Sequence, residues 1–221
     1  MHSNPLSYCF LALALMLFVG CEKYPRVQPQ PPLPENAGFT GGTAFFEEDF
    51  SGNLDRFETQ SKNWKIVDGA LYTGDRKNEN AGLWIKSLRL PQNVRIEFEA
   101  RSVKGNNKLF QGDIKCEFGG ELNEHTSGYI VILGGWENST SIIARQDEHN
   151  DGPIAVDKTQ RVEEGQTYKF AVVRMENEIR WYLDGKLFLK ATEKQILTGG
   201  SFGFNNWNSR VYFDNLKIFA L

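Results

Sequence analysis

Apolar and polar residues alternate with a period of two along most of the chain after about residue 45, and the helical period is nearly absent. The segment 94–102 reads VRIEFEARS, with Ile96, Phe98 and Ala100 on one face and charged residues on the other. The segments 112–120 (GDIKCEFGG) and 176–190 (ENEIRWYLDGKLFLK) show the same alternation. Because successive side chains of a strand point to opposite faces, each segment predicts a half-buried β-strand.

Turn residues separate these segments at short intervals. Asp68-Gly69 and Asp184-Gly185 are dipeptides that favour type I′ hairpins. Further apolar or alternating runs cover residues 82–86, 128–133, 140–145, 168–175, 201–205 and 210–219. We therefore expect an all-β fold: a jelly-roll β-sandwich of two antiparallel sheets with about a dozen strands and little helix.

The N-terminus has the pattern of an export signal. The apolar run from Phe10 to Val19 has the length of a signal-peptide core and is too short to cross a bilayer. It ends in Phe18-Val19-Gly20-Cys21, which resembles the lipobox of bacterial lipoproteins and implies cleavage after residue 20 and lipidation of Cys21. An ordinary secretory signal and an uncleaved anchor are the alternatives.

Residues 21–43 are rich in proline, with five of the chain's eight prolines between Pro25 and Pro34. Such a segment predicts an extended spacer that builds no core of its own. Signal, cysteine and spacer together predict a lipid-anchored protein of the bacterial cell envelope, at the outer membrane or facing the periplasm, with its folded domain at residues 44–221.

Charge and cysteine content narrow the function classes. The formal net charge is −3 and no basic run occurs, so we expect no nucleic-acid partner. Cys116 is the only cysteine after Cys21, so the mature domain holds no internal disulfide. Cys116 shares a face with Ile114 and Phe118 and is predicted to be a small core residue.

Both ends of the domain carry a family resemblance. It opens with FFEEDFSGNLDRFETQSKNWKIVDGALYTG (45–74) and closes with the hairpin at 168–191 and GGSFGFNNWNSRVYFDNLKIF (199–219). These segments resemble the concanavalin A-like lectin/glucanase superfamily, which contains laminin-G-like domains and family 16 glycoside hydrolases. The resemblance covers most of residues 44–221, implies that the terminal strands pair, and says little about activity.

This sequence does not reproduce the catalytic pattern of the family 16 hydrolases that it resembles. Family 16 hydrolases carry Glu-x-Asp-x-(x-)Glu on one strand, and retaining hydrolysis needs two carboxyl groups about 5–5.5 Å apart. Here Glu97 and Glu99 alternate, but no Asp lies between them and Arg101 follows. We expect Glu97 and Glu99 to form ion pairs on a solvated face, beside Glu117 on a neighbouring strand. If the protein is an enzyme, the sequence favours a glycan hydrolase or lyase that uses Glu97, Glu99 or Glu117.

Half-exposed tryptophans are the better ligand candidates, because a sugar ring stacks on an aromatic face while polar groups bind its hydroxyls. Trp64 and Trp181 alternate with apolar residues and are predicted to be core; Trp84, Trp136 and Trp207 are candidates. The predicted ligand set is Trp136, Trp207, Asn205, Asn206, Arg145, Glu117 and His125. The alternative for Trp207 is a turn residue that caps the core.

Metal chemistry has one candidate. Zinc is disfavoured, because the mature chain would have one unmodified Cys and two separated His. The resemblance implies a structural calcium ion, for which Asp49, Gly52 and Asp214 are the matching positions; alternatively Asp214 only hydrogen-bonds a turn. No other cofactor is expected.

The sequence thus favours a membrane-anchored lipoprotein, expected to be monomeric, whose jelly-roll domain binds carbohydrate without turnover. The alternatives are the divergent hydrolase or lyase described above and a protein-binding module of the laminin-G-like kind.

Overall fold

The computed structural model describes Pro34 and residues 36–59, 61–74, 81–105 and 109–221. The compact unit that contains them runs from Pro34 to Leu221. The predicted signal sequence, Cys21 and most of the spacer lie outside these residues. Within them, no helix has the length and apolar character needed to cross a membrane.

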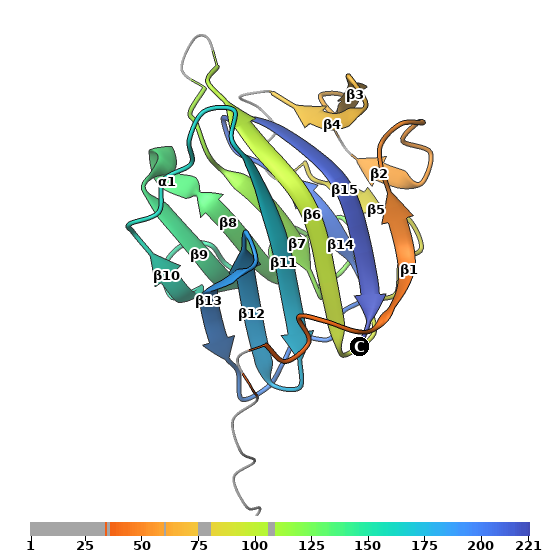
Figure 1. Cartoon of the computed structure of the whole chain (residues 1–221), viewed down its shortest axis with the longest axis vertical. Coiled ribbons are helices and arrows are strands. Elements are labelled where there is room, and N and C mark those ends of the chain that lie inside the picture. The colour runs from red at the N-terminus through yellow and green to blue at the C-terminus, as the bar shows by residue number, and fades with distance from the viewer. Residues whose placement is uncertain (1–33, 35, 60, 75–80, 106–108) are drawn as a thin grey trace, which may run out of the picture. The chain divides into compact units, whose positions relative to one another are not determined.

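Two antiparallel sheets form the domain (Figure 1). The eight-stranded sheet has the order β13 (Lys186–Thr192), β12 (Glu178–Leu183), β11 (Thr167–Met175), β6 (Val94–Val103), β15 (Arg210–Ala220), β4 (Ala70–Thr73), β3 (Lys65–Val67), and β1 (Thr43–Glu48) pairs with β15. The seven-stranded sheet has the order β10 (Pro153–Asp157), β9 (Thr140–Arg145), β8 (Tyr129–Gly134), β7 (Ile114–Phe118), β14 (Phe202–Asn205), β5 (Leu83–Ile85), β2 (Phe57–Thr59). One short helix, α1 (Gly135–Asn138), follows β8. The all-β jelly-roll prediction is confirmed.

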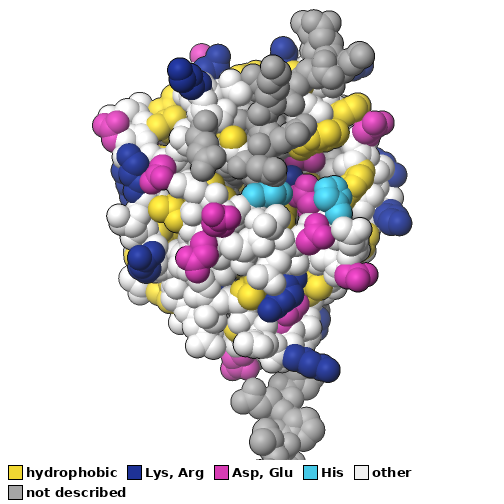
Figure 2. Space-filling view, turned by 180° about the vertical axis from the view of Figure 1, so that it is seen from behind, with side chains coloured by type: hydrophobic (Ala, Val, Ile, Leu, Met, Phe, Trp, Pro, Cys, Tyr) yellow, Lys and Arg dark blue, Asp and Glu magenta, His cyan; other side chains and the backbone are white. Residues whose placement is uncertain are grey.

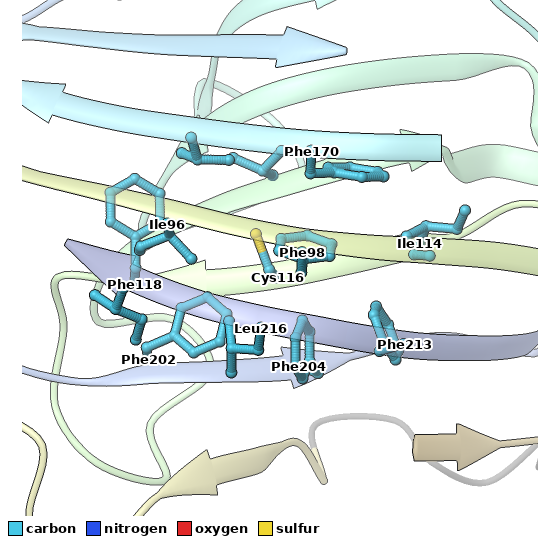
Figure 3. Close-up of a cluster of buried hydrophobic side chains, with 14 of the residues drawn as sticks. Ile96, Phe98, Ile114, Cys116, Phe118, Phe170, Phe202, Phe204, Phe213 and Leu216 are labelled. Carbon is cyan, nitrogen blue, oxygen red and sulfur yellow. The ribbon is translucent and has the colours of Figure 1, made fainter. Parts of the chain in front are cut away.

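The core lies between the inner faces of the two sheets (Figure 3). The Phe98 ring stacks on Phe170 with centroids 4.5 Å apart and meets Phe204 edge-on at 5.1 Å. Cys116 lies in this core and is 1% exposed, as its alternation predicts. Trp64 and Trp181 are also core residues, as predicted.

The local turns form as the dipeptides predict. Asp184 and Gly185 both have positive φ, 50° and 78°, between β12 and β13. Asp68 and Gly69 do the same between β3 and β4. Positive φ at both central residues matches the twist of the flanking strands, which is why Asp-Gly suits these positions. The terminal strands β1 and β15 pair, as the family resemblance implies.

The end of the predicted spacer is part of the folded domain. Arg180 donates to the carbonyl oxygen of Pro34, and Arg95 donates to those of Gly38 and Gly41. The Phe39 ring packs on Tyr182 with centroids 4.5 Å apart. Because these contacts bind buried guanidinium groups, Pro34 and residues 36–42 are held against the eight-stranded sheet.

Candidate functional site

A groove with a volume of about 810 Å³ lies over the outer face of the seven-stranded sheet. Ile132 of β8, on the face turned away from the core, forms part of it. Loop residues and two tryptophans complete the lining: Asp113, Asn123, Glu124, His125, Thr126, Trp136, Asp147, Glu148, His149 and Trp207. Figure 2 shows this side of the molecule, where histidine side chains lie among acidic and apolar ones.

A row of charged residues runs along β7 beneath the groove. Asp113, Lys115 and Glu117 alternate along the chain and share the face opposite Cys116. The side chains of Lys115 and Glu117 are only 3% and 2% exposed. The prediction of a solvated face is therefore wrong for β7, because the loops that carry His125 and Glu148 fold over it.

Lys115 joins two carboxylates of the groove. Its Nζ donates to Oε2 of Glu148 at 2.7 Å and lies 3.8 Å from Oδ1 of Asp113. Asp113 also accepts the backbone N–H of Trp207 at 2.8 Å, which ties the β14–β15 turn to β7. The two carboxylates thus face one buried cation from different segments.

Burial and the ion pairs shift the pKa values of these groups in different directions. Burial raises the pKa of Asp113, and Lys115 offsets this only in part. Burial also acts on Glu148, but Lys115 and His125 outweigh it and hold the pKa of Glu148 below its ordinary value. The carboxylates around Lys115 overcome its desolvation and raise its pKa to about 12. Lys115 and Glu148 are therefore charged at neutral pH.

Glu117 holds His125 in place. Nδ1 of His125 lies 2.7 Å from Oε1 of Glu117, which also accepts a hydrogen bond from Asn205 at 2.8 Å. Nε2 of His125 lies 3.8 Å from Oε2 of Glu148. Burial lowers the pKa of His125, but the hydrogen bond and charge of Glu117 outweigh it, so the net shift is upward. Oε2 of Glu117 is buried and has no hydrogen-bond partner among the described residues.

Two half-exposed tryptophans flank this polar centre, Trp136 at 39% and Trp207 at 38% exposure. Trp207 stacks on Phe110 with centroids 6.1 Å apart. Trp136 meets His149 edge-on at 5.8 Å.

The turn that presents Trp136 is strained. Trp136, Glu137 and Asn138 have φ values of 48°, 59° and 62°, in the left-handed region that side chains disfavour. The Asn138 amide pins the turn by exchanging two hydrogen bonds with the backbone of Val162, at 2.8 and 2.9 Å. Strain of this kind persists where the surroundings fix it, and it is concentrated at functional sites.

The predicted ligand set is brought together only in part. Trp136, Trp207 and His125 line the groove, and Glu117 and Asn205 lie in the network below it. Asn206 instead donates to the carbonyl oxygen of Ser209 and is 1% exposed, so it holds a turn.

Arg145 and Trp84 are also placed away from the groove lining. Arg145 binds Glu193 at 2.7 Å and the carbonyl oxygen of Gln195, because it follows the inward face of β9 that Ile143 occupies. It is not a groove residue. Trp84, the remaining aromatic candidate, is 3% exposed on β5.

Glu97 and Glu99 do not join Glu117. They lie on β6 in the eight-stranded sheet, whereas β7 belongs to the other sheet, because the chain crosses between sheets after Val103. Glu97 pairs with Arg95 at 2.7 Å, and Glu99 lies 3.8 Å from the exposed Lys169. Both glutamates therefore form ion pairs, with Arg95 of their own strand and with Lys169 of β11, but the predicted position beside Glu117 is wrong, because β6 and β7 are not neighbouring strands.

The residues predicted for calcium fit a cation only in part. Asp49 lies near enough to Asp214 that its charge adds to burial in raising the pKa of Asp214. Oδ1 of Asp49 accepts two hydrogen bonds from Ser51, and Oδ1 of Asp214 accepts the N–H of Asn215. Among the described residues, no group of three His, Cys, Asp or Glu side chains is placed to hold a metal ion. The calcium ion stays a prediction.

A family model described as a domain of unknown function, DUF6250, matches residues 106–216, which is 111 of the 221 residues. The chain belongs to the DUF6250 family. The match includes β7 to β14, and so most of the groove. No curated protein matches the sequence.

Solved structures show the fold class of this DUF6250 protein. The carbohydrate-binding module CBM66 of Bacillus subtilis superposes with a TM-score of 0.61 at 17% identity, covering 75% of this chain and 96% of that one. A β-glucanase of Bacillus licheniformis gives 0.62 at 13% identity, over 82% and 100%. The exoplasmic domain of VIP36, bound to Ca²⁺ and mannose, gives 0.60 at 11% identity, over 75% and 83%. The chain thus has a concanavalin A-like jelly-roll fold, as predicted.

Sequence reasoning missed Asp113, Lys115 and Glu148 as parts of one cluster. Asp113 and Lys115 had the alternation of an ordinary polar face, and Glu148 stands in a loop far along the chain. The available signal was the neighbouring strand: residues 129–133 read YIVIL, apolar on both faces, so both faces of that sheet had to be covered.

Proposed function

We propose that this protein binds carbohydrate in the groove over the seven-stranded sheet. The observation that carries the proposal is the pairing of two half-exposed tryptophans with a fixed polar centre. The apolar face of a pyranose stacks on an indole ring, while carboxylates and imidazoles bind its hydroxyls. The likeness to a carbohydrate-binding module and a mannose-bound lectin domain supports the proposal at the level of fold.

The polar centre is well suited to this role because it is held before any ligand arrives. Glu117 and Lys115 fix His125 and Glu148 at 2.7 Å each, from beneath the groove. Groups held in this way lose little conformational entropy on binding, which favours affinity.

The test is retention on a polysaccharide panel, measured together with release of reducing ends and unsaturated sugars. The fragment should begin at Pro34, since Arg180 contacts that residue. We expect retention, and expect Trp136→Ala and Trp207→Ala each to weaken it by about five- to tenfold, since aromatic contacts contribute roughly 1 kcal/mol. Phe45→Ala is the matched control, because Phe45 is an exposed aromatic outside the groove. Failure of the fragment to bind any glycan would instead favour the protein-binding module.

Binding without turnover is the form of the proposal that the sequence favours. One observation favours a second candidate, a glycan hydrolase: Asp113 and Glu148 line the same groove with pKa values displaced in opposite directions. Such a divergence is typical of an acid and a nucleophile or base. Reproducible product release that Glu148→Gln abolishes would replace binding by hydrolysis.

We also propose that the domain is anchored to a bacterial envelope membrane through a lipidated Cys21. The support is the signal-like run, the lipobox pattern and the proline-rich segment before the folded domain. Stable attachment needs more than one acyl chain, which lipoprotein modification supplies. Cys21→Ser should move the protein from the membrane fraction to the soluble fraction, and unchanged fractionation would overturn the anchor.

A further inference from the structure

Acidic groups dominate the groove lining. Four lining residues are carboxylic acids, Asp113, Glu124, Asp147 and Glu148, and none of the lining residues that the structure describes is Lys or Arg. Lys115 lies below the lining and is held by two of those carboxylates. It is only 3% exposed, so it is withdrawn from a ligand.

Two of these four carboxylates, Asp147 and Glu148, are charged at neutral pH. Hydrogen bonds from His149 and Asn150 hold the pKa of Asp147 below its ordinary value, and Lys115 does the same for Glu148 against the effect of burial. A positive charge on His125 does not cancel these acids, because buried Glu117 already opposes it from 2.7 Å away. An incoming ligand therefore meets acceptors and negative charge, flanked by Trp136 and Trp207.

We propose that the groove selects glycans free of carboxylate and sulfate groups, and that it binds a protonated amino sugar more tightly than the N-acetylated form. This inference rests on the proposed carbohydrate binding and deepens it. A neutral sugar donates its hydroxyl hydrogens to the carboxylate oxygens of the lining, each of which can accept more than one hydrogen bond. An ammonium group adds a charge-assisted hydrogen bond to the same acceptors. A uronate or sulfate group would be placed beside like charges with no described cation available to it.

The experiment measures affinity for pairs of probes that differ only in charge, using the purified full chain in detergent. The pairs are glucosamine and N-acetylglucosamine oligomers, polygalacturonate and its methyl ester, and sulfated and unsulfated galactan. At about pH 6 the glucosamine amines are mostly protonated. Where the neutral member binds, polygalacturonate and sulfated galactan should each bind at least tenfold more weakly than their neutral partners. The glucosamine oligomer should bind more tightly than its acetylated partner. Added salt should narrow both differences.

Charge variants test the cause. Glu124→Gln and Asp147→Asn each keep the side-chain shape and remove one charge from the groove lining. Each should improve binding of the acidic probe and weaken binding of the amine by about threefold, the effect of one charge at ~6–7 Å in water. Glu176→Gln, at the exposed β11–β12 turn, is the matched control and should change neither.

The outcomes separate the two proposals. If neutral glycans are retained and their acidic partners bind equally tightly, charge selection is overturned and carbohydrate binding stands. Equal affinity for the amine and its acetylated form, or control-like behaviour of both lining variants, also overturns charge selection. Absence of retention for every probe overturns carbohydrate binding as well.

Discussion

Lys115→Met is predicted to destabilise the protein more than any exposed charge change. Lys115 is the one cation that contacts both Asp113 and Glu148 among the described residues, and its side chain is 3% exposed. Methionine keeps the length and apolar stem of lysine, so the change removes the charge and leaves little cavity. Two carboxylates then share a buried site without their counter-ion.

The magnitude follows from that loss. Removing one partner of a buried ion pair costs about 3–5 kcal/mol, because the remaining charge stays desolvated. The side chain of Glu148 is 15% exposed and gains some hydration, so we expect a value near the lower end, about 3 kcal/mol. Lys169→Met is the matched control: its Nζ lies 3.8 Å from Glu99, the side chain is 74% exposed, and the cost is about 0–1 kcal/mol.

The contributions of Glu148 and Lys115 to stability depend on pH in defined directions. The pKa of Glu148 is lowered in the folded protein, so its contribution is present above the ordinary value of 4.5 and is lost as the pH falls through the folded pKa. The pKa of Lys115 is raised from 10.5 to about 12, so its contribution is complete below 10.5 and is lost as the pH rises toward 12. In Lys115→Met the carboxyl pKa values rise and protonation relieves the repulsion. The difference from wild type should therefore shrink as the pH falls from neutral toward about 4.

The assay is urea unfolding at several pH values, followed by tryptophan fluorescence and circular dichroism, with the free energy of unfolding taken by linear extrapolation. A loss at neutral pH no larger than that of Lys169→Met would refute the reasoning. A loss that stays constant across the acidic range would refute the assignment of its cause.

Three further predictions concern single groups. The pKa of His125, followed by NMR titration, should lie above 6.5, and Glu117→Gln should lower it. The stabilisation from this pair is then present below pH 6.5 and disappears as the pH rises through the folded pKa. An unchanged His125 titration in the variant would contradict the contact. Cys116 is buried and burial raises the pKa of its thiol, so the fragment from Pro34 should take up one equivalent of thiol reagent only in denaturant; rapid labelling of the native protein would contradict its place in the core. If calcium binds as predicted, millimolar Ca²⁺ should raise Tm and Asp214→Asn should abolish the shift, whereas equal shifts in both proteins would exclude Asp214 as a ligand.

The fold could be predicted because its signals are local. Alternation within each segment gave the strands, and the Asp-Gly dipeptides at 68–69 and 184–185 gave two hairpins with the required positive φ. Sheet membership is not a local property. The alternation of residues 94–102 and 112–120 is similar, yet β6 and β7 lie in different sheets. The predicted proximity of Glu97 and Glu117 failed for that reason.

The site itself depends on loops that return to a strand from elsewhere in the chain. His125 follows Glu117 by eight residues, and Glu148 follows Lys115 by thirty-three, but both pairs meet at 2.7 Å. The predicted ligand set contained both His125 and Glu117, but the periodicity gave no sign that the two side chains contact each other. Loop conformation is set by tertiary contacts, so spacing alone does not reveal such pairs.

The register between β7 and β8 explains why charged residues of β7 form a cluster instead of a solvated face. Lys115 and Glu117 lie opposite Ile132 and Ile130, which belong to a separate apolar cluster on the outer side of the sheet. An apolar strand next to a charged one cannot leave that side open to water without exposing its isoleucines. Once loops cover the isoleucines, the charges beside them are buried too, and buried charges need partners. The partners come from the loops that carry His125 and Glu148, and the groove lies beside those loops, with Ile132 and Asp113 in its lining. The apolar outer face of β8 is thus the physical reason that the polar centre exists.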